Sequence, residues 1–489
     1  MLTPVNLPFT SPGTSSGTSP GTPHGTPVTP PGAYRARRRL LQEHVPGLGI
    51  VFAAGHAPAR NYAGNTYAFR ASSHFLYFGG PAIEGAVILI DRGRSTLFCD
   101  PPDEGDALWH GARPSLEERA AAAGVDEARP IGELAEALHG GRERIATLAP
   151  LGHAAAAALG QHLGRTVTAG SAARLEPGSH DARLADAVID IRLHHDDAAI
   201  DQLRAAATAS VAAHEAGMRA TRDARIEREV AAAMIATLRA RGMGDAYGPI
   251  VTVHGEILHS HSHDGPIAPG DLLLCDVGGE TPEGWAGDIT RTWPVSGTYS
   301  PTQRALIEVV LASQLRAIDR VRPGVRYRDV HETAKRSLVE GLRDLKILRG
   351  EVDGLLERGA AALFFPHGVG HLIGLDVHDM EDLGDRAGYA PGRTRSAAFG
   401  DSFLRLDRDL EPGMAVTIEP GFYQVPAILD DPARVERFKG DLDRDVLAKF
   451  ADVRGIRIED DVLCTTGDPE VLTGALVKHP ADIEQLMAG

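Results

Sequence analysis

The sequence predicts an α+β protein in which a smaller α/β domain precedes a larger domain that carries the functional residues. The chain has 489 residues, 43% of them hydrophobic, which is enough for more than one packed core. In its first part, short apolar runs alternate with alanine-rich helical segments, as in α/β domains. In its second part, aspartate, glutamate and histidine interrupt the apolar runs. A length of ~150 residues per domain would allow three domains, but two domains and a tail fit equally well.

Residues 1–33 are predicted to form a disordered tail. They are rich in threonine, proline, glycine and serine and show no apolar periodicity. Such a segment cannot bury enough surface to offset the entropy that it would lose on ordering. A partner-binding arm is the alternative interpretation.

Residues 34–193 are predicted to form the α/β domain. Four short apolar runs indicate buried strands, at residues 49–54, 85–90, 95–99 and 144–150. Between them, residues 115–124 and 131–140 indicate helices, and each ends at a glycine, the residue that most readily forms a helix C-cap. No Gly-x-Gly-x-x-Gly turn follows the first strand, so no dinucleotide site is expected there.

A long amphipathic helix is predicted to open the second domain, which spans residues 194–489. Its apolar positions recur at steps of three or four: Ile200, Leu203, Ala207 and Val211. Either Asp196 or Asp197 can cap its N-terminus. The domain boundary is therefore placed just before this helix.

Charge and composition exclude several classes of partner. Acidic residues number 66 and basic residues 50, and the net charge of −16 argues against nucleic acid or an anionic membrane surface as a partner. No apolar run reaches the ~18 residues of a membrane span, and the N-terminus does not resemble a secretory signal. Three scattered cysteines do not suggest a disulfide framework or a zinc motif. We therefore expect a cytoplasmic protein without a membrane partner.

Two aspartates lie in neighbouring apolar segments of the second domain. Asp276 follows the run Leu-Leu-Leu-Cys, and Asp288 lies 12 residues later among strand-forming residues, a spacing that suits an antiparallel hairpin. A buried aspartate is costly unless it is paired or bound to a metal ion. For each aspartate alone, a satisfied structural carboxylate remains an equal alternative.

Three later segments add further metal-ligand types. They contain His367, His371, His378, Glu419 and Glu459. Strand alternation would aim Arg457 and Glu459 at one face. Four carboxylates with an imidazole form a hard, oxygen-rich set that suits Mn²⁺, with Co²⁺ or Zn²⁺ as alternatives. Their combined charge suits two divalent ions, an arrangement used by hydrolases.

These segments resemble the pita-bread metallopeptidases, in particular the proline-specific branch that includes aminopeptidase P and prolidase. The motifs AGDITRTWPVSG, HGVGHLIGLDVHD, MAVTIEPGFY and GIRIEDD occur in the order and spacing of that family. The N-terminal half is similar to the family's N-terminal domain through VFAAGHAPARNYAGNTYAFR and FLYFGG. The resemblance implies a pita-bread catalytic domain, preceded by the smaller α/β domain.

The resemblance also implies roles for the metal ligands. Asp276 would bind one metal ion, Asp288 and Glu459 would bridge two, and His371 with Glu419 would bind the second. Glu419 would also be the general base for a hydroxide that bridges the two ions. The reaction would be hydrolysis of the bond between an N-terminal residue and proline.

Four other residues correspond to substrate-contacting positions of the family. His378 would contact the scissile peptide, His259 would stabilise the transition state, and Arg457 would lie beside the bridging glutamate. His367 would line the proline pocket. The substrate would be a peptide or dipeptide with proline in second place, and family members are usually dimers or tetramers.

The sequence leaves the substrate length open. The N-terminal domain is more similar to bacterial aminopeptidase P, whereas Arg405 and the long segment before it are more similar to prolidase, in which an arginine holds the dipeptide carboxylate. We favour an aminopeptidase P-type enzyme that also accepts dipeptides. A surface charge is the alternative interpretation of Arg405. Ser73-His74 stands where relatives have Ser-Asp, which removes the basis for a substrate contact from that loop.

Three other functions on the same fold agree less well with the sequence. An inactive binding module or a metal-free creatinase-like hydrolase would have lost metal ligands, and all five are present here. A methionine aminopeptidase would not account for the large N-terminal domain or the Val-His-Asp segment.

Overall fold

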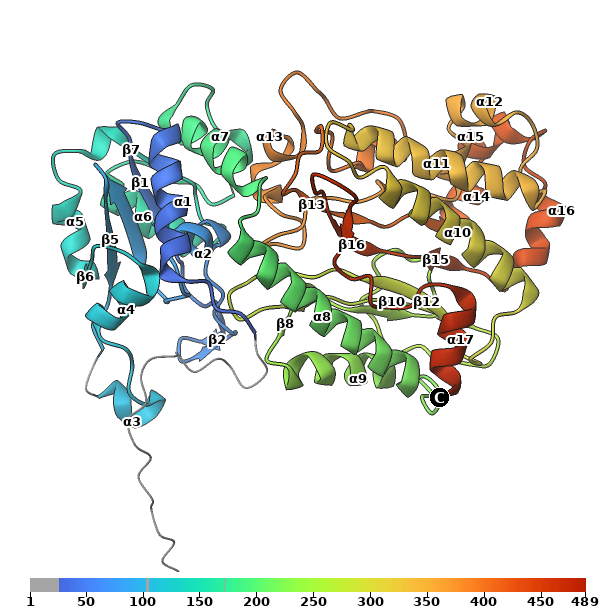
Figure 1. The fold of residues 1–489 in the computed structure, drawn as a ribbon, viewed down its shortest axis with the longest axis horizontal. Coiled ribbons are helices and arrows are strands. Elements are labelled where there is room, and N and C mark those ends of the chain that lie inside the picture. Colours follow the sequence, from blue (N-terminus) through green and yellow to red (C-terminus); the bar gives the residue numbers. More distant parts are fainter. Residues whose placement is uncertain (1–25, 103–104, 171) are drawn as a thin grey trace, which may run out of the picture.

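The computed structural model describes residues 26–102, 105–170 and 172–489. The first part of the chain forms a five-stranded sheet with the order β6-β5-β4-β1-β7 (Figure 1). Its strands are β1 (Gly49–Ala53), β4 (Val87–Asp91), β5 (Arg94–Cys99), β6 (Glu127–Pro130) and β7 (Ile145–Thr147). A small hairpin of β2 (Ala59–Tyr62) and β3 (Asn65–Thr66) stands apart from it.

The central strand β1 explains the position of the N-terminal core. All five of its residues are buried, because it pairs with β4 on one side and β7 on the other, and helices cover both faces of the sheet. Ile50 and Phe52 face one hydrophobic cluster, whereas Val51 and Ala53 face another. A continuous apolar run is what a strand buried on both faces requires.

Most predicted elements of this part are present, with shifted ends. The helix expected at 115–124 is α4 (Leu116–Ala123), which a capping box at Ser115 opens and Gly124 closes in the left-handed conformation. The expected helix at 131–140 is wrong in extent. It is divided into a 3-10 turn (Ile131–Glu133) and the short α5 (Leu134–Ala137). The last predicted strand is also shorter than 144–150.

The prediction of a disordered tail is wrong at the C-terminal end of that segment. Helix α1 begins at Pro31, and Thr29 donates hydrogen bonds from its backbone N–H and its hydroxyl to the carboxylate of Glu283. Gln202 donates to the carbonyl oxygen of Pro27. These contacts with distant parts of the chain order a segment that has no apolar pattern of its own. Residues 1–25 lie outside the described residues, so disorder there stays a prediction.

The described residues of the first part also form four further helices. They are α2 (Ser73–Phe78), α3 (Asp106–His110), α6 (His153–Leu163) and α7 (His180–Arg192). Helix α1 (Pro31–His44) packs against α2, α4 and α7.

The predicted boundary between residues 193 and 194 falls between two helices. Helix α7 ends at Arg192, and α8 (Asp197–Ala220) begins after Asp196, whose side chain accepts a hydrogen bond from the backbone N–H of Ala199. Arg37 of α1 forms an ion pair with the same aspartate at 2.7 Å. The two parts therefore make contact at this junction, and their division into separate domains stays a prediction.

Small sheets form the centre of the second part. Strands β9 (Ile250–Thr252), β10 (Leu272–Asp276) and β12 (Thr290–Pro294) form one sheet; β13 (Ala415–Ile418), β16 (Asp460–Leu463) and β17 (Glu470–Val471) form another. Two-stranded ladders join β8 (Gly244–Asp245) to β11 (Gly279–Glu280) and β14 (Gly421–Tyr423) to β15 (Gly455–Arg457).

Helices cover these strands from two sides (Figure 1). The strands fall into a first group, β8 to β12, and a second group, β13 to β17. Helices α8 and α9 (Glu227–Ala240) pack against β8, β9 and β11 of the first group. Helix α10 (Pro301–Asp319) packs against β13, β14 and β15 of the second group. Helix α11 (Tyr327–Asp344) lies along α10. The remaining helices are α12 (Val352–Glu357), α13 (Asp385–Gly388), α14 (Pro426–Leu429), α15 (Pro432–Val435), α16 (Arg444–Leu447) and α17 (Pro480–Ala488). Among the described residues, no helix is long and apolar enough to span a membrane.

Asp460 connects the two groups of strands from a fully buried position. It forms ion pairs with Arg291 of β12 and with Lys478, both at 2.8 Å, and it accepts hydrogen bonds from Gln314 and Thr473. These positive charges outweigh the cost of burial, so the pKa of Asp460 lies well below its usual range.

We predict that Asp460→Ala lowers the free energy of unfolding by about 3–5 kcal/mol, because it leaves Arg291 buried without its counter-ion. Thermal and denaturant unfolding of the variant would measure the loss. Asp468→Ala is the matched control, since this aspartate is 93% exposed in its ion pair with Arg322. Equal stability of the two variants would contradict this account of Asp460.

Candidate metal centre

The hairpin of β10 and β12 brings the two predicted aspartates together. Asp276, the last residue of β10, lies opposite Thr290, the first residue of β12, and the antiparallel ladder continues from there. Asp288 precedes β12 by two residues, and its backbone N–H donates to the carboxylate of Asp461 at 3.0 Å. Both aspartates are buried. The expected hairpin is therefore present, with the carboxylates at its closed end.

The two glutamates come from the other group of strands. Glu419 follows β13, and Glu459 lies between β15 and β16. The backbone N–H of Glu459 donates to the carbonyl oxygen of Thr290, and the Thr290 hydroxyl donates to the Glu459 carboxylate at 2.6 Å. One threonine thus joins the two groups of strands at the point where their carboxylates meet.

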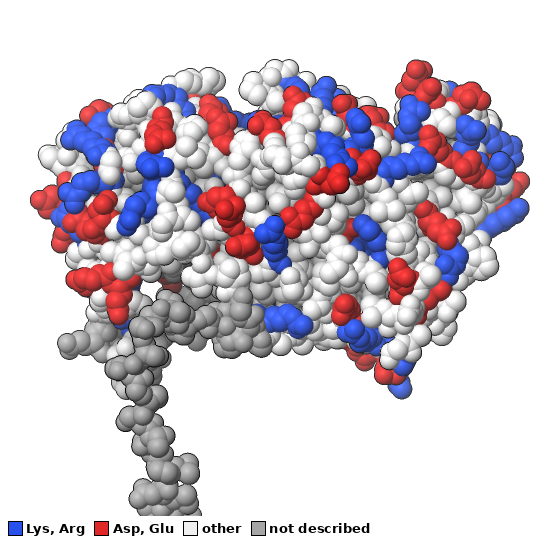
Figure 2. Space-filling view, viewed as in Figure 1, with Lys and Arg blue, Asp and Glu red and all other residues white. Residues whose placement is uncertain are grey.

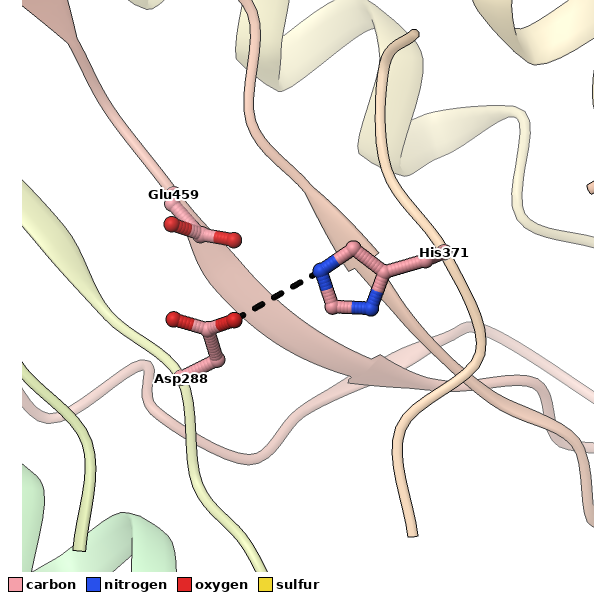
Figure 3. Close-up of side chains that lie close together, drawn as sticks. All are labelled: Asp288, His371 and Glu459. Atoms are coloured by element: carbon pink, nitrogen blue, oxygen red, sulfur yellow. Dashed lines mark ion pairs between the residues drawn. The ribbon is translucent and has the colours of Figure 1, made fainter. Parts of the chain in front are cut away.

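His371 completes the cluster, with its ring edge aimed at the carboxylates (Figure 3). Its Nε2 lies 3.5 Å from Asp288 and 3.8 Å from Glu419. Its Nδ1 lies 2.9 Å from the carbonyl oxygen of Leu372, which can only accept a hydrogen bond, so Nδ1 carries the proton. Burial lowers the pKa of His371 to about 4, and the neutral ring therefore presents the lone pair of Nε2 to the carboxylates. This is the arrangement of a metal-binding imidazole.

The electrostatics of the cluster favour a bound cation. Burial and the neighbouring charge of Asp276 raise the pKa of Asp288 to about 8. Burial, with Asp288 beside it, likewise raises the pKa of Glu419 to about 8, and the pKa of Glu459 lies well above its usual range. Carboxylates packed this closely must take up protons or bind cations.

The ligand atoms fit a divalent ion. Atoms of Asp288, His371 and Glu459 all lie within 4.8 Å of one another, and each residue is buried. Asp276 and Glu419 line one cavity together with these three residues. Four carboxylates and one neutral imidazole match the donor set of a hard or borderline divalent metal ion.

Arg457 is the cation within the cluster. Its guanidinium donates to Asp276 at 2.5 Å and to the hydroxyls of Thr290 and Tyr423 at 3.0 and 3.1 Å. It is buried, and one guanidinium cannot balance four carboxylates. The remaining charge is what bound divalent ions would neutralise.

The cluster opens onto a cavity of about 680 Å³. The four other predicted residues, His259, His367, His378 and Arg405, all line it. His367 donates from Nδ1 to the carbonyl oxygen of Gly368 and accepts at Nε2 from the Tyr423 hydroxyl at 2.9 Å. The ring of His378 lies edge-on to that of His371, with 4.3 Å between ring centres. The structure thus brings together every candidate site residue.

Several residues of the site were not among the predicted ones. The Tyr247 hydroxyl lies 2.5 Å from Asp276 and 2.6 Å from Asp288, and Thr290 and Tyr423 support Glu459 and His367. Thr290 and Tyr423 lie within the motifs AGDITRTWPVSG and MAVTIEPGFY, but the motifs by themselves assign them no role. Glu381 could have been noticed, because it follows His378 by three residues and contacts its Nδ1 at 2.8 Å.

His74, which stands where relatives have an aspartate, does not line the cavity. Its Nε2 donates to Asp382 at 3.0 Å, while its Nδ1 accepts from the buried guanidinium of Arg192 at 3.1 Å. It therefore connects helix α2 to the segment that follows His378.

Comparison with known proteins gives the family. The profile of metallopeptidase family M24 matches residues 201–466, and that of the aminopeptidase P N-terminal domain matches residues 34–145. A probable Xaa-Pro aminopeptidase of Verticillium alfalfae is 31% identical over 457 residues, covering 91% of this chain and 94% of its own length.

Solved structures agree over most of the chain. Aminopeptidase PepP of Pseudomonas aeruginosa superposes with a TM-score of 0.76 at 31% identity, covering 94% of this chain and 98% of that one. Zinc-substituted aminopeptidase P of E. coli in complex with product superposes with a TM-score of 0.73 at 30% identity, over 94% and 98%. The predicted fold class, a pita-bread domain after a smaller α/β domain, is confirmed. The chain belongs to metallopeptidase family M24, with the N-terminal domain of an aminopeptidase P.

Proposed function

We propose that this protein is a metal-dependent Xaa-Pro aminopeptidase, which hydrolyses the bond between an N-terminal residue and a proline in second position. One observation carries the proposal: five metal-ligand residues converge beside a cavity that is also lined by His259, His367 and His378. The likeness to Xaa-Pro aminopeptidases over more than nine-tenths of the chain supports the same activity.

Asp276, Asp288, His371, Glu419 and Glu459 would hold two divalent metal ions. We propose Mn²⁺, because carboxylate oxygens outnumber the single imidazole nitrogen, with Co²⁺ or Zn²⁺ as alternatives. When bound, such ions polarise the substrate carbonyl and supply an activated water molecule. Asp288 and Glu459 would be the bridging ligands, as the likeness to aminopeptidase P implies, and their carboxylates lie within 4.8 Å of each other and of the His371 ring nitrogen.

The protein's own groups would handle protons and orient the substrate. Glu419 is the proposed general base, as the likeness to aminopeptidase P implies, and it lines the cavity beside the other proposed ligands. His378 and His259 line the cavity and would contact the carbonyl group and the leaving nitrogen. Arg457 would hold the ligand Asp276 in place.

Proline specificity has a physical basis in this arrangement. The bond before proline is a tertiary amide without an N–H group, so an enzyme cannot hold it by that hydrogen bond. Here imidazoles line the cavity beside the proposed metal centre and could guide the substrate without it. His367, held between Gly368 and Tyr423 and packed edge-on against Phe365, is the proposed wall of the proline pocket.

The remaining proposals concern partners and location. The substrate is a peptide with proline in second place, and we expect neither a nucleic-acid nor a membrane partner. Basic and acidic side chains are interspersed over the face shown in Figure 2, which fits this view. Homodimers or tetramers and a cytoplasmic location remain proposals; the three free, buried cysteines agree with a reducing compartment.

We predict that Asp288→Asn abolishes hydrolysis and lowers the bound metal content, because a bridging ligand loses its charge. Metal content after dialysis, activity on Ala-Pro-Ala and the circular dichroism spectrum would be measured. The spectrum should stay that of the folded protein. Asp271→Asn is the matched control, because Asp271 caps a turn just before β10. Full activity of the Asp288 variant would refute the two-metal proposal.

We predict that His378→Ala retains its metal ions but loses about 10²- to 10⁴-fold in turnover, as expected for a group that assists proton transfer or orients the substrate. The kinetics of Ala-Pro-Ala hydrolysis and the metal content would test this. Unchanged kinetics would exclude His378 from the chemistry.

A peptide-length series tests the choice between aminopeptidase and dipeptidase. We expect hydrolysis of an Ala-Pro-headed tripeptide and pentapeptide with Mn²⁺ supplied, because the cavity has room beyond a dipeptide. Activity confined to the Ala-Pro dipeptide would instead make the protein a prolidase.

A further inference from the structure

Glu381 is a site residue that joins two groups of the cavity wall. One of its carboxylate oxygens accepts a hydrogen bond from Nδ1 of His378 at 2.8 Å, and the other forms an ion pair with Arg405. The hydrogen bond from His378 lowers the pKa of Glu381 to about 2, so it is a carboxylate at neutral pH. His378 and Arg405 both line the cavity.

Arg405 is the cavity cation best placed to meet the C-terminus of a short substrate. Of the other lining arginines, Arg395 pairs with Asp385, Arg434 lies against the ring of Phe399, and Arg457 is inside the carboxylate cluster. Arg405 differs from them in sharing a carboxylate with His378. Because one carboxylate bridges His378 and Arg405, the guanidinium lies close to the imidazole. One residue spans at most about 3.6 Å, so the carboxylate of a dipeptide cleaved beside His378 would end near Arg405.

Glu381 itself is held in place from the N-terminal part of the chain. The next residue, Asp382, accepts a hydrogen bond from His74 of α2, and the buried Arg192 of α7 both donates to His74 and pairs with Asp379 at 2.6 Å. Ser73 also donates to Asp376 at 2.8 Å. The segment around His378 is thus fixed at both ends by side chains of α2 and α7.

We propose that Glu381 determines substrate length by neutralising Arg405. This inference rests on the proposed Xaa-Pro hydrolysis and adds a selectivity to it. A dipeptide brings its free carboxylate to a guanidinium that is already paired and to a second negative charge, so it binds poorly. A longer peptide has a neutral amide at that point and meets no repulsion. Glu381 also orients His378, as a positioning residue, for substrates of every length.

The test compares Ala-Pro with Ala-Pro-amide, which differ in the C-terminal charge alone. In Glu381→Gln, kcat/KM should fall for both substrates, because His378 loses its partner. The ratio of kcat/KM for Ala-Pro to that for the amide should rise about three- to tenfold, the scale of a partly exposed charge pair. In the double variant Glu381→Gln/Arg405→Gln the ratio should fall back, since no guanidinium is left to attract the carboxylate.

Glu411→Gln is the matched control, because this glutamate also pairs with a histidine, His194, and that histidine does not line the cavity. Its ratio should equal that of the unaltered protein. An unchanged ratio in Glu381→Gln, or a raised ratio that persists in the double variant, would overturn the inference while the proposed activity stands. Failure of the unaltered protein to cleave any Xaa-Pro substrate would overturn both.

Discussion

The mutual repulsion of four buried carboxylates is the constraint on which the rest of the site depends. Asp276, Asp288, Glu419 and Glu459 meet where little water can screen them, and the pKa of three of them is raised. A fold can hold such a cluster only with counter-charges and donors built around it. Arg457 and the hydroxyls of Tyr247 and Thr290 supply part of this, and the family's divalent ions supply what remains.

The surrounding fold is arranged to keep this cluster rigid. Each pair of acids comes from its own group of strands, and Thr290 links the two groups by its hydroxyl and its carbonyl oxygen. One residue further along each segment, Arg291 and Asp460 form a second, fully buried connection. The stability of the strands and the geometry of the site therefore depend on neighbouring residues of the same two segments.

The N-terminal part of the chain contributes to the site through its helix α2, which supports the site but does not line the cavity. His74 and Ser73 of that helix hold the segment 376–382, which carries His378 and Glu381. Arg70 adds hydrogen bonds to the carbonyl oxygens of Gly284 and Leu375. The ion pair between Arg37 and Asp196 and the contact of Thr29 with Glu283 hold the two parts together. We infer that this part acts on catalysis by positioning.

The sequence by itself determined the fold class, and it predicted the five ligand positions and the histidines that the structure places around them. An acid within a run of Val, Ile and Leu is costly enough to be noticed, and local alternation sets which way it points. Tertiary structure alone decided the contacts of Tyr247, Thr290 and His74 and the pairing of Arg405 with Glu381. It also decided that residues 26–33 are ordered rather than disordered. These contacts join residues from distant segments or across an irregular loop. They depend on strand register and on how the two parts pack, and no local pattern of residues encodes either.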